Sequence, residues 1–202
     1  MERKVKRWVK AVALAMSLGL ATEPLMAVTG NPVDLNVTVT VQSTWIAASN
    51  RDNGTSTVPL GNVQAGSQTV GTVPISVTNA GNVTETYTLV IQDSPVGWTP
   101  VLTGTPVSEE YKLSGMFRAP ASAAPQTTDY DDNDAFAVGT SSKTADGDNV
   151  LGLPADGSGA GAKGYQMTDG SNVNLWLKFH APESTAVTGE QTVVVRISGQ
   201  TP

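Results

Sequence analysis

Apolar and polar residues alternate strictly along much of this chain, and this pattern constrains the fold more than any other feature. Between Leu35 and Val41 each odd residue is Leu or Val and each even residue is Asn or Thr. A period of two places all the apolar side chains on one face of an extended strand. Apolar residues recur at every second position in the segments 73–77, 87–91, 173–179 and 193–197. No segment after residue 27 carries a helical stripe, so the sequence predicts an all-β fold.

Strands that are apolar on one face must bury these faces against each other. The simplest solution is a two-sheet antiparallel β-sandwich of the Ig-like or jelly-roll type, with about seven to nine strands. The alternation places strands at 33–42, 44–48, 58–63, 72–79, 83–92, 98–103, 110–118, 172–180 and 190–198. Gly-containing turns separate them: Ala80-Gly81-Asn82 predicts a hairpin, and Asn53-Gly54, Asp156-Gly157 and Asp169-Gly170 predict further reversals.

One stretch of the sequence is similar to a known kind of module. A small-residue turn within 60–67 leads to a strand over 73–78, an Asn79-Ala80-Gly81-Asn82 corner, and a strand that carries Tyr87 and Leu89. This run resembles the Ig-like modules of bacterial surface proteins. It is more distantly similar to the jelly-roll subunits of the TasA and camelysin family, which build extracellular fibres. The resemblance covers residues 60–92 and implies the fold but no activity.

The first 27 residues are typical of a secretory signal peptide. A basic segment, residues 1–10, precedes an apolar run from Ala11 to Ala21. That run is shorter than the roughly 18 to 20 residues that cross a bilayer, so it predicts targeting without a membrane span. A small residue suits cleavage either after Ala27 or after Ala21, and we favour Ala27 because the alternating pattern starts soon after it. We expect one mature domain, residues 28–202.

Charge and cysteine content narrow the functional classes. After cleavage at Ala27 the chain keeps seven basic and sixteen acidic residues, a net charge near −9. Nucleic acids and anionic lipids need clustered cations, so neither is an expected partner. The chain has no cysteine, which excludes disulfides and thiolate metal sites. The expected location is outside the cytoplasm: the periplasm, the cell surface or the medium.

The alternation fails between Arg118 and Ser171, where Ala, Gly, Ser, Asp and Pro dominate. We call residues 119–171 the excursion. A structureless loop of this length is uncommon in a compact domain, so the excursion is functional, partly folded or mobile. Two short strands at the sheet edge are expected within it, Ala135–Val138 and Asn149–Leu153. The stretch from Asp156 to Gly164 predicts a flexible tip.

A cluster of oxygen ligands lies in the excursion. Calcium takes six to eight oxygens, and closely spaced Asp and Asn residues in a loop can supply several of them. The candidate ligands are Asp129, Asp131, Asn133 and Asp134. The spacing departs from a helix-loop-helix calcium site, because Asp134 replaces the turn glycine and Thr140 replaces the bidentate Glu. A solvated acidic loop is the alternative, and no other cofactor is expected.

The tryptophans divide into two groups. Trp45 and Trp98 continue or begin apolar strand faces, which predicts core positions. Trp176 is out of phase with its apolar neighbours and shares the outer face with Lys178 and His180. An exposed Trp176 would be a platform for a sugar or a neighbouring subunit. The alternative is that the excursion folds over it.

Catalytic motifs are absent from the sequence. His180 is the only histidine, so no multi-histidine zinc site exists, and no Gly-x-Ser-x-Gly elbow is present. The simpler role for His180 is a polar residue at a strand end. A hydrated Asp-rich loop also lacks the apolar pocket that raises the pKa of a glycosidase acid. We therefore expect a protein that is not an enzyme.

Two functional hypotheses remain. The first is a structural or adhesive protein of the cell envelope or matrix. It would assemble with itself or other envelope proteins by strand addition, with the alternating segment 33–42 either in its own sheet or donated to a neighbour. The second is a calcium-assisted module that binds a glycan or another ligand through the Asp cluster and Trp176.

Overall fold

The structure is a computed structural model that describes residues 34–44, 47–50, 56–139, 142–153 and 159–202. These residues contain eleven strands, more than the seven to nine expected from the sequence, and three short 3-10 helices. The strands are β1 (Asp34–Thr44), β2 (Ala47–Asn50), β3 (Thr57–Gln64), β4 (Gln68–Val70), β5 (Ile75–Thr78), β6 (Thr86–Asp93), β7 (Thr99–Pro100), β8 (Glu110–Arg118), β9 (Lys143–Thr144), β10 (Asn172–His180) and β11 (Gln191–Gln200). The 3-10 helices are η1 (Thr127–Asp129), η2 (Asp132–Asp134) and η3 (Ala160–Lys163).

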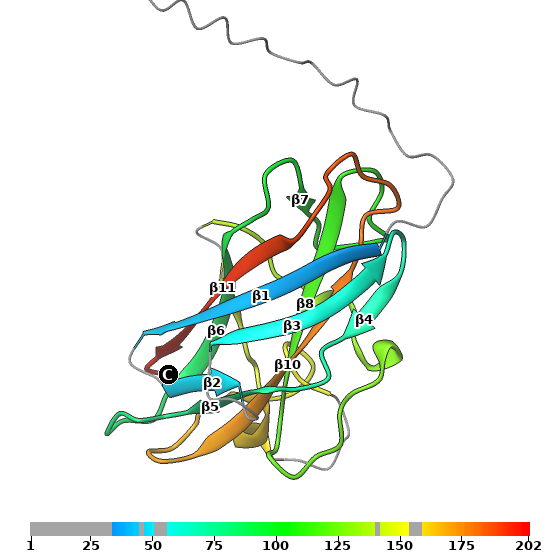
Figure 1. The fold of residues 1–202 in the computed structure, drawn as a ribbon. Coiled ribbons are helices and arrows are strands. Elements are labelled where there is room, and N and C mark those ends of the chain that lie inside the picture. Colours follow the sequence, from blue (N-terminus) through cyan, green and yellow to red (C-terminus); the bar gives the residue numbers. More distant parts are fainter. Residues whose placement is uncertain (1–33, 45–46, 51–55, 140–141, 154–158) are drawn as a thin grey trace, which may run out of the picture.

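The predicted all-β sandwich is confirmed, with two packed sheets (Figure 1). The first sheet has the order β3-β1-β11-β6-β9 and the second has the order β2-β5-β10-β8-β7, with β4 also paired to β10. The expectation of purely antiparallel sheets needs a correction, because β1 runs parallel to β11 and β7 runs parallel to β8. The first and last long strands therefore lie side by side in the middle of one sheet.

The predicted hairpin at Ala80-Gly81-Asn82 is wrong. The strand before it, β5, belongs to the second sheet and the strand after it, β6, belongs to the first. The turn is instead a crossover at one end of the sandwich. Asn79 is fully buried there, and its side-chain amide donates to the carbonyl oxygens of Val83 (2.7 Å) and Met167 (2.9 Å). The bond to Val83 closes the turn, and the bond to Met167 ties the crossover to the excursion.

The inward side chains of the alternating strands form the core. Its largest fully buried members are Tyr87, Tyr111, Phe117, Phe179, Ile75, Leu89, Ile91 and Leu113, and Phe136 and Leu151 of the excursion join them. Trp98 is a core residue as predicted, 5% exposed, and its ring lies 5.9 Å from Tyr111 and 6.0 Å from Phe179 between centroids. Such tilted and offset ring pairs add stability beyond their buried area.

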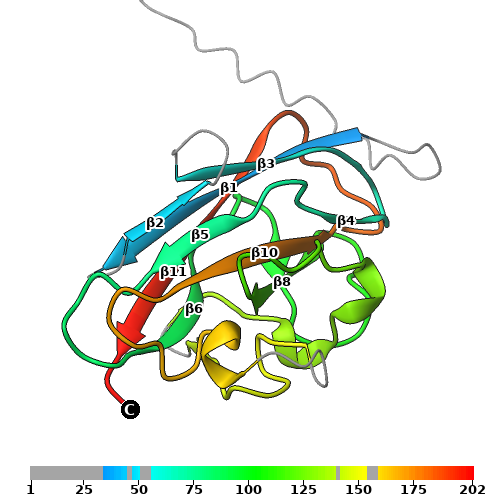
Figure 2. The same ribbon diagram turned by 90° about the horizontal axis from the view of Figure 1, so that it is seen from below.

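The excursion packs on the sandwich rather than looping away from it (Figure 2). The first expected edge strand, Ala135–Val138, is only partly right, because Ala135 and Val138 form single bridges to Ser114 and Ile91. The two-residue strand of the excursion is instead β9, which pairs with β6. Around Asn149–Leu153 no strand forms, although the Leu151 carbonyl accepts a hydrogen bond from the Phe117 N–H. The excursion thereby spans from the β8 edge of one sheet to the β6 edge of the other.

Several expectations concern residues outside the described part of the chain: the signal peptide 1–27, Trp45, Asn53-Gly54 and Asp156-Gly157. Within the expected flexible tip, residues 160–163 form η3 and Lys163 is only 5% exposed. The turn at Asp169-Gly170 is confirmed. In the part of the chain that the structure describes, no helix has the length and apolarity to span a bilayer.

Gly115 offers a test of the packing between sandwich and excursion. A Cβ at this position would lie 2.6 Å from Leu89 Cδ1 and 3.2 Å from Phe136 Cε1. We expect Gly115→Ala to lower the free energy of unfolding by about 1 to 3 kcal/mol, because the core must shift to admit the methyl group. Urea unfolding measures it. Gly161→Ala is the control, because a Cβ there meets nothing within 4 Å; equal effects of both changes would contradict the packing.

Candidate functional site

The strands β8 and β10 carry four polar and two apolar side chains on the side that faces away from the core. The register sets Lys112 opposite His180, Ser114 opposite Lys178 and Met116 opposite Trp176. In an open sandwich this side would face water. Here residues 119–134 lie over it, and we call it the covered face. Every one of the six residues is at most 9% exposed.

Two lysines of the covered face hold the excursion in place. The Lys112 ammonium donates to Asp132 Oδ1 (2.9 Å) and to the Gly104 carbonyl (2.6 Å). The Lys178 ammonium donates to the Thr127 carbonyl (3.2 Å) and lies 5.0 Å from the centroid of the Tyr130 ring. A desolvated ammonium over an aromatic face is attracted by the ring quadrupole. Each lysine therefore links the sheet to a different turn of the excursion.

The predicted calcium ligands make local hydrogen bonds instead of converging on one point. Asp129 Oδ2 accepts from the Gln126 N–H (2.7 Å), and Asp131 Oδ1 accepts from the Asn133 N–H (2.7 Å). Asp134 Oδ2 accepts from the Asp131 N–H (3.1 Å). Side chains of this kind close short turns and 3-10 helices. The described residues contain no group of three or more acidic or histidine side chains that could hold a metal ion, and calcium binding stays a prediction.

Asp134 stands out among these carboxylates. Asp134 is only 1% exposed, and its Oδ1 has no hydrogen-bond partner in the described part of the chain. Burial raises the pKa of the Asp134 carboxyl to about 7, while the Asp131 N–H opposes the shift; the Asp131 charge raises the pKa and Lys178 lowers it. Near neutral pH the carboxyl is therefore present in both protonation states.

The cations of the covered face shift in the opposite direction. Burial lowers the pKa of the Lys178 ammonium, and the charge of Lys112 lowers it further. Burial also lowers the pKa of His180, with contributions from Lys112 and Lys178. The hydrogen bond from Lys112 is the main cause that lowers the pKa of Asp132. The imidazole of His180 is therefore neutral at pH 7, and the position of His180 at the end of β10 agrees with the expectation from the sequence.

The excursion covers Trp176, which is 4% exposed, so the indole is not an open platform for a sugar or a subunit. It packs with Met116 and Tyr130 in a second apolar cluster, with Val70 and Leu153 at its margin. The physical reason is area: an uncovered indole and methionine on a sheet would leave a large apolar patch in water. Of the two alternatives for Trp176, the structure shows the folded-over one.

The sequence alone did not single out Lys112 and Lys178 as anchoring residues. Lys178 and His180 were placed beside Trp176 by the alternation, and the same period puts Lys112 on the outer face of β8. The one sign in the sequence that these lysines could be buried is that Lys178 lies on the same strand face as Trp176. The alternation does not predict the partners of these lysines, because Asp132 and Thr127 come from a segment without periodicity.

The chain matches no known protein-family model and no curated protein. The resemblance of residues 60–92 to Ig-like modules and to the TasA and camelysin family therefore stays a prediction. The chemistry of the covered face rests on its own geometry: a buried, charged contact layer that fastens a long segment to a sheet.

The Asp134 carboxyl generates a prediction about pH. Because its pKa is raised in the folded state, its contribution to stability is full below about pH 4 and is lost as the pH rises to about 7. We expect Asp134→Asn to remove this loss. At pH 8 the variant should be more stable than the wild type by about 1 to 4 kcal/mol, and at pH 4 the two should be similar.

Urea unfolding of both proteins at several pH values measures this difference. Asp132→Asn is the matched control, since its carboxyl has a lowered pKa and its loss should weaken the protein at pH 8. A stability difference between Asp134→Asn and the wild type that stays constant from pH 4 to pH 8 would show that Asp134 does not titrate in this range.

Proposed function

We propose that this protein is a non-enzymatic structural or adhesive module outside the cytoplasm, which assembles by exchanging its first strand, β1, between copies. The signal-like segment at residues 1–27 supports the location. One structural observation carries the proposal of assembly: the first long strand of the chain is a central strand of its sheet, between β3 and β11.

Both neighbours of β1 bind it over most of its length. Residues 37–44 pair with residues 191–198 of β11, and residues 34–40 pair with residues 57–64 of β3. Val37 and Val39 are fully buried, and each contributes about 1.5 to 3 kcal/mol by leaving water. A sheet without β1 would expose both neighbours and this part of the core. A β1 from a second copy would restore the same contacts.

Exchange of β1 fits the structure better than addition at the outer edge of this sheet. The outermost strand there is β3, which carries the exposed Pro59 and a register shift opposite Val37 and Thr38. Proline has no backbone N–H to donate, and irregular edges resist pairing with another sheet. Gly61, with φ at +73°, adds to this irregularity.

Strand exchange would also set the geometry of the assembly. One copy would offer β1 and the next would receive it between β3 and β11, so the two contacting surfaces differ. Heterologous contacts of this kind extend into fibres unless the rotation closes a ring. The parallel pairing of β1 with β11 fixes the direction in which each copy enters the next.

The absence of cysteine permits a direct test. Thr38 and Thr192 are register partners on the outer side of β1 and β11, where neighbouring strands are close enough for a disulfide. We expect the double variant Thr38→Cys, Thr192→Cys to form a covalent ladder on oxidation, seen on a non-reducing gel. Light scattering of the unmodified mature chain should show a mass that rises with concentration.

Each single variant, Thr38→Cys or Thr192→Cys, is a control that can form no more than a disulfide dimer. The opposing result is a double variant that gives only an internally crosslinked monomer, together with a mass that stays monomeric at every concentration. That outcome would place β1 in its own sheet and end the proposal of exchange.

A further inference from the structure

A small apolar pocket lies where the excursion crosses from one sheet edge to the other. It has a volume of about 140 Å³ and is lined by Leu102, Ala135, Phe136, Ala137, Ser142 and Lys143. We call it the Lys143 pocket. It is on a different side of the excursion from the covered face, because Ala135 bridges to the edge of β8 and Lys143 pairs with Leu89 of β6.

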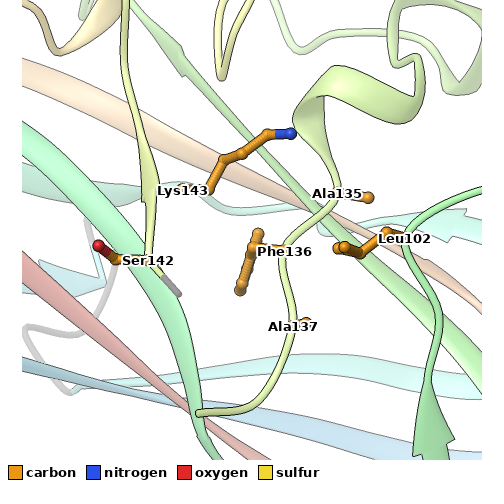
Figure 3. Close-up of a pocket in the computed structure, with 6 residues that line it drawn as sticks. All are labelled: Leu102, Ala135, Phe136, Ala137, Ser142 and Lys143. Carbon is orange, nitrogen blue, oxygen red and sulfur yellow. The ribbon is translucent and has the colours of Figure 1, made fainter. Parts of the chain in front are cut away.

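The local sequence explains why a space remains there. Phe136 turns into the core, 1% exposed, above the hydrogen side chain of Gly115, and its N–H donates to the Leu113 carbonyl (3.2 Å). The residues on both sides of it are alanines, whose small side chains line the pocket together with the edge of the ring. Leu102 forms the opposite wall and is 45% exposed. Figure 3 shows the Phe136 ring between Leu102 and Lys143.

Lys143 gives this pocket a charge. Its side chain extends along the pocket, and the ammonium points toward the turn that contains Ala135 (Figure 3). In the part of the chain that the structure describes, the Lys143 ammonium makes no hydrogen bond and no ion pair. Lys143 is partly buried and has no carboxylate partner among the described residues, so its positive charge beside the pocket can attract an anion.

We propose that the Lys143 pocket binds a small apolar carboxylate, with the ring or branched aliphatic group beside Phe136 and the carboxylate at the Lys143 ammonium. An apolar cavity of about 150 Å³ is large enough for a benzene ring. A single lysine complements a monoanion, and the walls offer apolar contact. This inference is independent of the exchange of β1.

The test uses phenylacetate as the probe and phenylacetamide, its uncharged analogue of similar shape, as the matched control. Both are titrated into the mature, isotope-labelled protein while its amide NMR signals are recorded. We expect saturable shifts at Ala137 and Lys143 and a dissociation constant for phenylacetate at least about fivefold lower than for phenylacetamide. Lys143→Met should abolish this preference and keep weak binding of both compounds.

Two variants fill the pocket from opposite walls. Ala137→Leu and Leu102→Trp should each abolish the shifts from both compounds, whereas Ala123→Leu, at an exposed position of the excursion, should bind as the wild type does. Unchanged amide spectra without ligand show that the variants fold. With two independent substitutions, the test remains possible if one variant does not fold.

Three results would overturn the proposal. The first is no saturable shift with phenylacetate at about 10 mM, a concentration that detects millimolar binding. The second is binding that persists in both folded pocket-filling variants. The third is a preference for phenylacetate that survives Lys143→Met.

Discussion

The burial of β8 and β10 on both faces is the constraint on which the rest of this structure depends. Seven consecutive residues of β8 and eight of β10 are buried. One face packs in the sandwich, and the other carries Met116, Trp176 and two lysines. An antiparallel sheet normally leaves its second face to water. A sheet with such a second face needs a further layer, and residues 119–134 supply it. The long segment without alternation is therefore a structural layer, and its polar composition suits a surface that is itself exposed on its other side.

The excursion also closes the sandwich at its side. After covering the second sheet it passes the β8 edge at Ala135, inserts Phe136 into the core and reaches the β6 edge at Val138. Gly115 makes this insertion feasible, because any side chain there would meet the Phe136 ring. Edge strands with free N–H and C=O groups invite pairing with other chains. The segment that inserts Phe136 into the core therefore also covers the β8 edge and the β6 edge.

Alternation was enough to predict the long strands, because it reports directly which face of a strand is buried, but it missed the short strands β4 and β9. It did not predict the pairing, since β5 and β6 have the pattern of a hairpin and yet lie in different sheets. The crossover depends on Asn79 and its bond to Met167, a residue 88 positions away. The role of Asp134 was equally out of reach. In the sequence it is one of several aspartates in an acidic loop, and only the fold shows that it is buried while Asp131 is exposed. The Lys143 pocket depends on three separate segments, so no local pattern contains it.

The distribution of charge bears on how copies of such a domain could associate. Residues 28–202 have a net charge near −9, and this charge opposes unspecific contact between copies. The segment of β1 is different, because Asp34 is its one ionisable residue and the rest is Val, Thr, Leu, Asn, Gln and Ser. Transfer of this strand to a second copy, as proposed, would add little charge at the contact. Its recognition would depend instead on backbone pairing with β3 and β11 and on the burial of Val37 and Val39. An acidic surface with one nearly neutral exchangeable strand would select a single mode of contact, because every other mode brings like charges together.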